Sequence, residues 1–337
     1  MFNRRKIKFL PLNQRKNKIT VQSIYRLDDK VAAYQNADLK ILASRVIAAR
    51  KNGKPVIWAM GAHPIRRGNS RFIIDLMKRG FITHLAVNGA CAIHDFEFAA
   101  IGATCEDVEF YIKNGRFGNW RETGFYINAA AKDGFKNKRG LGESVAKMLY
   151  CGKILSHSLQ LPHKEISIFR AAYEFKILIT VHKGIGYDIT DQHPSADFAA
   201  LGWTSGRDFL IFADSISKLE GGGVFLSIGT QVMGPEVYLK SLSMARNVAS
   251  QQQKEIRKFT TAVFDIIDLG NWKDEPDVAN YKKPKAMADP RYYFRPLKSI
   301  LIRTVKDGGE SFYIRGDFGT TIPALYRCIV AEQDEIF

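Results

Sequence analysis

From about residue 40 onward, short apolar runs alternate with amphipathic stretches along the chain. Residues 56–60 (VIWAM) and 224–228 (VFLSI) are typical of these runs. A short, continuous apolar run indicates a strand that is buried on both faces, as in a parallel sheet. Strands separated by helices favour an α/β architecture. We therefore predict an open, mainly parallel α/β sheet that is flanked by helices.

The same pattern predicts individual elements. A helix at 72–78 has a cap at Asn69 or Ser70 and a stop at Gly80, and Pro235 opens a helix at 236–248. Further helices are expected at 140–159, 208–219 and 320–331. Strands are expected at 56–60, 83–87, 177–181, 224–228, 261–267, 300–305 and 311–314. The polar stretch 270–296 is expected to be a long loop, which in a compact domain is usually functional or disordered.

Composition excludes several classes of protein. The chain has 337 residues, of which 46% are hydrophobic, so there is enough apolar material for a core and the chain is neither disordered nor fibrous. No apolar run approaches the ~18 residues of a membrane span, and the basic start is not followed by the apolar core of a secretory leader. Four scattered cysteines form no CxxC pair and no zinc spacing, which predicts reduced thiols, a cytoplasmic location and no metal site.

Positive charge is concentrated at the start of the chain. The formal net charge is +16, and residues 1–20 hold seven basic residues and no acidic one. These seven are Arg4, Arg5, Lys6, Lys8, Arg15, Lys16 and Lys18. Two interpretations are open: a solvated arm, or an arm that binds an anionic partner. We expect a basic arm over residues 1–35 and a single α/β domain over 36–337, with the stretch 270–296 as a loop insertion.

Small residues follow three of the predicted strands. They are Gly61, Ala62 and His63 after the first strand, Asn88, Gly89 and Ala90 after the second, and Gly229 and Thr230 after a later one. In open α/β sheets, ligands bind at the carboxyl ends of the strands, and small residues there let the backbone approach a phosphate. The alternative is that these glycines only form tight turns. The GxGxxG fingerprint of dinucleotide sites is absent, and Gly184-Ile-Gly186 comes nearest to it.

Carboxylates are frequent near the same predicted strand ends, which would suit a cationic substrate. No GxSxG elbow supports Ser/His/Asp catalysis, and no HExxH motif supports metal-dependent hydrolysis. The acidic residues concerned are Asp95, Glu97, Asp188, Asp191, Asp197, Glu220, Glu236 and Asp317.

Several motifs, in order, resemble those of deoxyhypusine synthase, over roughly residues 40–330. The resemblance rests on the stretch 56–90, the acid Asp95 after it, the loop 182–188, the strand and turn 224–230, and the segment 314–318. This resemblance implies a Rossmann-like, NAD-binding fold and a homotetramer. It also implies an NAD-dependent aminobutyl transferase, in which a polyamine or other small amine is oxidised and its imine passes through an enzyme lysine.

The resemblance also implies roles for particular residues. Lys298 matches the catalytic lysine, with Lys306 as the second candidate, and Asp188 and Glu236 match the substrate-binding acids. Departures from the family pattern include Lys183 in place of an aspartate and Pro296-Leu297 before Lys298. The cofactor-binding residues implied are His63, Asn88, Gly89, Ala90, Asp95, Gly229, Thr230, Asp317 and Phe318.

Two further functions stay open. One is another NAD-utilising enzyme on the same scaffold, such as a sirtuin-like deacylase or an NAD hydrolase, which would consume NAD rather than recycle it. The other is a nucleic-acid-binding protein that uses the basic arm. The partners we expect are a small-molecule amine and further copies of this chain, rather than nucleic acid or a membrane.

Overall fold

A computed structural model describes residues 1–274 and 288–334. The chain divides into two compact units. Unit 1 comprises residues 1–27, 65–78 and 87–210, and unit 2 comprises residues 28–64, 79–86 and 211–337. The middle of the predicted loop 270–296 lies outside the described residues.

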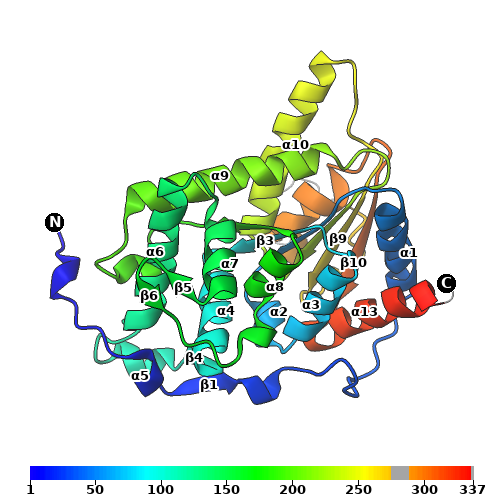
Figure 1. Cartoon of the computed structure of the whole chain (residues 1–337). Coiled ribbons are helices and arrows are strands. Elements are labelled where there is room, and N and C mark those ends of the chain that lie inside the picture. Colours follow the sequence, from blue (N-terminus) through cyan, green and yellow to red (C-terminus); the bar gives the residue numbers. More distant parts are fainter. Residues whose placement is uncertain (275–287, 335–337) are drawn as a thin grey trace. The chain divides into compact units, whose positions relative to one another are not determined.

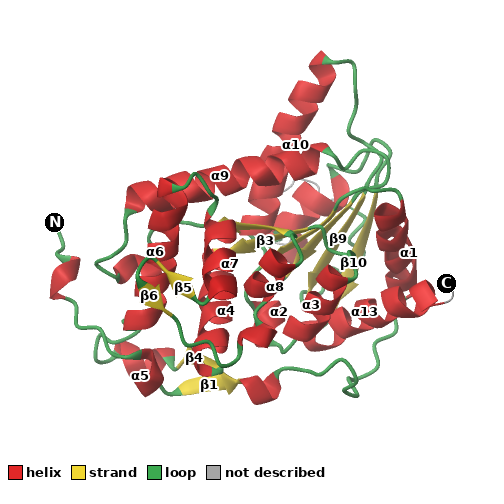
Figure 2. Ribbon diagram, in the orientation of Figure 1, coloured by secondary structure: helices red, strands yellow, loops and turns green. Residues whose placement is uncertain are grey.

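The central sheet has six strands in the order β10-β9-β8-β2-β3-β7 (Figures 1 and 2). The pairs β10–β9, β9–β8 and β8–β2 are parallel. Every residue of β2, β8 and β9 is buried, because helices cover a parallel sheet on both faces. The predicted fold class, a Rossmann-like α/β sheet, is confirmed. The strands are β2 (Val56–Met60), β3 (His84–Asn88), β7 (Leu178–His182), β8 (Val224–Ile228), β9 (Thr260–Asp265) and β10 (Glu310–Arg315).

The strand order contains a reversal between β2 and β8. From β2 the chain continues to β3 and then β7, whereas β8 lies on the other side of β2 and leads on to β9 and β10. This is the strand order of dinucleotide-binding folds, in which the ligand lies at the point where the order reverses. Both strands at the reversal belong to unit 2.

In unit 2, helices and a buried aromatic pair cover the sheet. Helix α1 (Ala37–Lys51) packs beside α13 (Phe318–Asp334), as Figure 1 shows. On α10 (Met233–Gln251), the ring of Tyr238 stacks on Phe225 of β8 with centroids 4.2 Å apart, and its hydroxyl donates to Thr304 at 3.2 Å. A short helix, α12 (Pro290–Tyr293), precedes the π-helix η7 (Leu297–Ile302).

Unit 1 is mainly helical, and its amino-terminal segment is part of the structure. Strand β1 (Asn17–Thr20) pairs antiparallel with β4 (Ala103–Glu106), and Arg15 beside it is only 6% exposed. Arg15 is therefore not part of a solvated arm. The helices are α3 (Ser70–Lys78), α4 (Gly89–Ile101), α5 (Val108–Ile112), α6 (Arg121–Lys136), α7 (Leu141–Cys151) and α8 (Ile168–Glu174). Helices α2 (His63–Arg66) and α9 (Phe198–Ser217) span the boundary between the units.

Two predicted elements are wrong. Of the strand expected at 300–305, residues 300–302 are the end of the π-helix η7 and residues 303–305 form a turn. A short buried apolar run has the same appearance in a strand and in a buried helix. The helix expected at 140–159 ends at Cys151, where Gly152 takes the left-handed conformation (φ +63°) that closes a helix. Strands β5 (Lys153–Ile154) and β6 (His157–Ser158) then form a small hairpin. Within the described residues, no helix combines the length and apolar character that a membrane span needs.

Candidate functional site

The carboxyl edge of the sheet in unit 2 is where the small residues of the sequence converge. The backbone N–H of Gly61, just after β2, donates to the carbonyl of Ile228 at the end of β8, with 3.4 Å between the atoms. In the same way, Gly229 N–H donates to Phe264 at 3.1 Å, and Gly316 N–H donates to Asp265 at 2.9 Å. The ends of the four strands β2, β8, β9 and β10 thus lie side by side, with the reversal point between the first two.

The loop after β8 needs a glycine at its first position. Gly229 has φ +58°, and a Cβ there would lie 2.9 Å from ring carbons of Phe318. The next residue, Thr230, is 7% exposed, and its hydroxyl oxygen accepts a hydrogen bond from Gly234 N–H at 2.9 Å. This fixes the loop against the first turn of α10. Two predicted cofactor-binding residues, Gly229 and Phe318, therefore lie in contact.

At the amino terminus of α10, the Thr230 hydroxyl caps Gly234 N–H. The cap position itself is Val232, which is 72% exposed and makes no side-chain hydrogen bond, and Pro235 has no N–H to donate. The first N–H groups of a helix carry partial positive charge and favour an anion such as a phosphate. The helix has 19 residues, so its dipole is fully developed.

A carboxylate that the sequence analysis did not single out completes this edge. Asp265 is the last residue of β9 and is 4% exposed. Its Oδ1 accepts from Ile266 N–H at 2.8 Å, and its Oδ2 accepts from Gln231 Nε2 at 3.3 Å. Asp317, which precedes α13, accepts from Gly319 N–H at 2.8 Å and so caps that helix. Predicted His63 is exposed at the start of α2.

The remaining predicted residues of unit 2 lie in other surroundings. Lys298 is on η7, and its ammonium is 5.3 Å from the ring centroid of Tyr292. Glu236 is near the start of α10 and pairs with Lys240 and Arg295. Its hydrogen bond with Lys240 contributes most to lowering the pKa of Glu236 below its ordinary value. Lys306 is exposed after η7.

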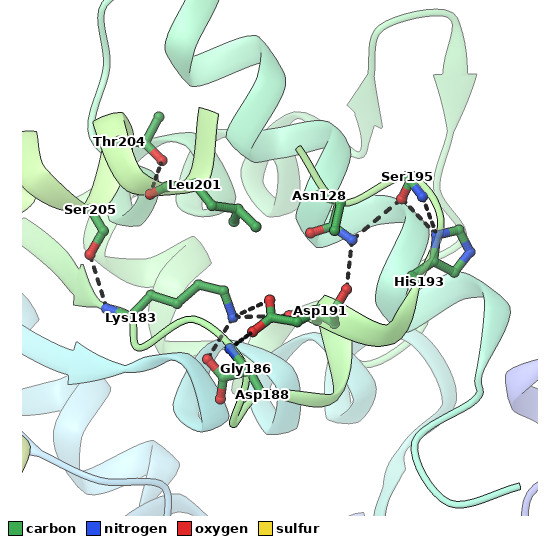
Figure 3. A network of polar contacts seen from close by, with 12 residues as sticks. Asn128, Lys183, Gly186, Asp188, Asp191, His193, Ser195, Leu201, Thr204 and Ser205 are labelled. Carbon is green, nitrogen blue, oxygen red and sulfur yellow. Dashed lines mark hydrogen bonds and ion pairs between the residues drawn. The ribbon is translucent and has the colours of Figure 1, made fainter. Parts of the chain in front are cut away.

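Unit 1 holds a buried ion-pair network after β7 (Figure 3). The side chain of Lys183 is 2% exposed, and its Nζ lies 2.7 Å from Asp188 Oδ2 and 2.8 Å from Asp191 Oδ1. Burial raises the pKa of Asp188, while Lys183 opposes that shift. The Asp188 carboxylate packs against Gly89, where a Cβ would lie 1.9 Å from Oδ2. The predicted residues Asp188 and Gly89 are thus brought together.

The connection after this network is held by a second set of hydrogen bonds. Asn128 of α6 donates to the carbonyl of Thr190 at 2.9 Å and to the hydroxyl of Ser195 at 3.3 Å. His193 Nδ1 lies 2.7 Å from the same hydroxyl (Figure 3). Burial, together with the nearby cation of Arg4, lowers the pKa of His193 to about 4, so the ring is neutral near neutral pH.

The other predicted residues of unit 1 stand around α4. The side chain of Asn88 caps α4 by accepting from Cys91 N–H at 3.0 Å. Asp95 is buried inside the unit, where it accepts from Ser167 Oγ at 2.6 Å and from Ile168 N–H at 2.8 Å. Desolvation raises the pKa of Asp95 to about 7. Its contacts hold the start of α8.

A cavity of about 270 Å³ lies beside α4, and Ala90 and Asp188 are among its lining residues. Another part of its wall is His94, whose Nδ1 is 2.6 Å from Thr104 Oγ1 and 3.8 Å from Cys105 Sγ. Cys105 has φ +66°, a backbone conformation that is rare outside glycine and that the sequence does not reveal. In the described parts of the chain, no three His, Cys, Asp or Glu residues are grouped so as to hold a metal.

Comparison with known proteins identifies no family. No family model matches the chain, and no curated protein matches it. Similar solved structures include a conserved LOR/SDH protein from Methanococcus maripaludis S2, with 14% sequence identity and a TM-score of 0.48. The match covers 91% of this chain and 73% of that protein. ArgZ, an arginine dihydrolase from cyanobacteria, has 13% identity and a TM-score of 0.48 over 89% of this chain. AgrE in complex with ornithine and NAD+ has 12% identity and a TM-score of 0.45 over 91% of this chain.

This chain spans only 32% of ArgZ and 34% of AgrE. The resemblance to deoxyhypusine synthase is wrong, because the similar structures are of the LOR/SDH and arginine dihydrolase types. The prediction of an aminobutyl transferase rested on that resemblance and is therefore also wrong.

Proposed function

We propose that the protein is an NAD-utilising enzyme whose dinucleotide binds at the carboxyl edge of the sheet in unit 2. The observation that carries this proposal is the β8–α10–β9 unit at the reversal of strand order. Such a unit binds a nucleotide through three parts: a glycine turn after the first strand, the helix amino terminus, and a carboxylate at the end of the second strand.

Each part has a residue in this chain. Gly229 makes the turn with its positive φ, and the positive end of the α10 dipole beside it would favour the pyrophosphate. Asp265 ends the second strand, and carboxylates at this position accept hydrogen bonds from the ribose hydroxyls. The aromatic ring of Phe318 beside Gly229 forms one wall of the same edge. The chain therefore uses the arrangement of a dinucleotide fold without its usual GxGxxG spacing.

The chemistry follows one of two routes that NAD supports. A hydride-transfer enzyme reduces NAD to NADH and leaves the nicotinamide attached, whereas a deacylase or hydrolase consumes NAD and releases nicotinamide. A small-molecule amine remains the predicted substrate class. Assembly into a homotetramer also remains a prediction, which light scattering would test.

Titration calorimetry with NAD tests the proposal through Val232. A Val232→Asp change places a carboxylate beside the amino terminus of α10, where it would repel a pyrophosphate. We expect it to weaken NAD binding by about tenfold or more, equivalent to about 1.4 kcal/mol. The matched control is Val232→Asn, which has nearly the same shape without the charge and should change the affinity less than about twofold.

Two results would contradict the proposal. One is a wild-type protein that does not bind NAD at millimolar concentration. The other is equal affinity in the wild type, Val232→Asp and Val232→Asn. If NAD binds as expected, nicotinamide release measured against NADH formation then separates the two classes of chemistry.

A further inference from the structure

Unit 1 contains a groove of about 870 Å³ that is separate from the proposed dinucleotide edge in unit 2. Its walls come from the amino-terminal segment (residues 2–10), the connection between α5 and α6 (114–119), and the connection from β7 to α9 (186–198). We call it the N-terminal groove. Its volume falls within the range of small-molecule sites.

The amino-terminal wall of this groove is held in place by contacts that do not involve the side chains of Lys6 and Lys8. The guanidinium of Arg4 donates to the backbone carbonyls of Asp191 at 2.9 Å and Ala196 at 3.1 Å, and it lies over the ring of Phe198 at 4.5 Å from the centroid. Further along, Leu10 exchanges backbone hydrogen bonds with residues 119 and 121. The backbone between these anchors therefore has a fixed course along the groove.

Three cations of the groove have no acidic partner among residues 1–274 and 288–334. They are Lys6, Lys8 and Arg116, and all three are exposed. The two acids of the groove, Asp188 and Asp191, are already paired with the buried Lys183. The groove thus presents a surplus of positive charge around a concave surface, which attracts an anion.

We propose that the N-terminal groove binds a small phosphate ester. The phosphate pairs with Lys6, Lys8 and Arg116. The proposal is independent of the dinucleotide site, because every residue it uses belongs to unit 1. A small ligand is favoured over nucleic acid because the three cations line one concavity.

Calorimetry on the full chain with ribose 5-phosphate, ribose and inorganic phosphate tests the proposal. A triple variant, Lys6→Ala with Lys8→Ala and Arg116→Ala, should bind ribose 5-phosphate about tenfold more weakly or worse. The matched control removes three exposed lysines of unit 1 that lie outside the groove, through Lys136→Ala, Lys153→Ala and Lys164→Ala. It loses the same charge and should change the affinity less than about twofold.

The NAD affinity of the groove triple variant should equal that of the wild type, which distinguishes failure here from failure of the dinucleotide proposal.

Three results would overturn the inference. The first is a wild-type protein that binds ribose 5-phosphate no better than ribose. The second is an equal loss of affinity in the groove variant and the control variant. The third is duplex DNA that displaces ribose 5-phosphate and binds with a steep salt dependence, which would assign the groove to nucleic acid instead.

Discussion

Replacing Arg15 by methionine should be among the most destabilising single changes in unit 1. The guanidinium is 2% exposed and donates to both oxygens of Glu97, at 2.8 Å and 2.5 Å, while Glu97 is 1% exposed. The Arg15→Met variant keeps most of the side-chain length and leaves Glu97 as a buried, unpaired carboxylate. Breaking such a pair costs about 3–5 kcal/mol. This is a large part of a typical stability of about 5–15 kcal/mol.

The loss should depend on pH in a defined direction. In the wild type, Arg15 and the surrounding donors outweigh desolvation and lower the pKa of Glu97, so this carboxyl contributes stability above its unfolded pKa and loses it as the pH falls. Without Arg15, desolvation is no longer opposed and raises the pKa of Glu97. A raised carboxyl pKa favours the folded state as the pH falls towards the unfolded value. The difference between wild type and variant should therefore shrink between about pH 7 and about pH 5.

Urea denaturation at these two pH values measures the effect. The Arg15→Met/Glu97→Gln double variant serves as the control, because a neutral amide can accept from one of the hydroxyls of Thr104 and Thr123 that now bind Glu97 and can donate to the other through its NH2 group. It should recover at least half of the lost free energy and show no extra pH dependence. A single variant that loses less than about 1 kcal/mol, or a loss that is equal at both pH values, would refute this account of the buried pair.

Two further outcomes follow from particular contacts. Gly142→Ala should destabilise by about 2 kcal/mol or more, because its Cβ would lie 2.1 Å from the carbonyl oxygen of Ile179, whereas Gly206→Ala, with open space around it in α9, should stabilise by about 0.5–1 kcal/mol in the same urea assay. Burial raises the pKa of Asp208 to about 8, so its contribution to stability falls as the pH rises from about 4 to 8, by at most about 1.4 kcal/mol per pH unit. Asp208→Asn should flatten that part of the pH profile of stability.

The strands of the sheet could be predicted where an apolar run has sharp limits. Strands β2 and β8 begin and end at the predicted residues, because Pro55 and Gly61 bound the first, and Gly223 and Gly229 bound the second. The run at 300–305 begins with three apolar residues but has no such limits, and residues 300–302 fold as the end of a π-helix. Apolar character alone measures burial, so it does not separate a strand from a buried helix turn.

The candidate site could be predicted only in part, for a related reason. Gly229 was found because it follows an apolar run, whereas Asp265 was missed because the run continues past it as Ile266 and Ile267. Only the end of the strand pairing places Asp265 at the edge of the sheet. The pairing of Lys183 with Asp188 and Asp191 also depends on the turn between them, which brings together side chains of opposite charge that the sequence merely places nearby.

The basic amino-terminal segment illustrates why a cluster of charge in a sequence is not yet a binding site. Arg15 is buried against Glu97, Arg4 is held by backbone carbonyls, and Lys18 pairs with Asp107 at 2.9 Å. Arg15 and Lys18 are paired with acids and Arg4 is bound to the backbone, so these cations are less available to an external partner. Lys6 and Lys8 differ, because the same fixed segment carries them into the N-terminal groove without an acid to meet them. An anionic ligand would encounter the charge that remains after the internal pairs are subtracted, rather than the charge counted along the chain.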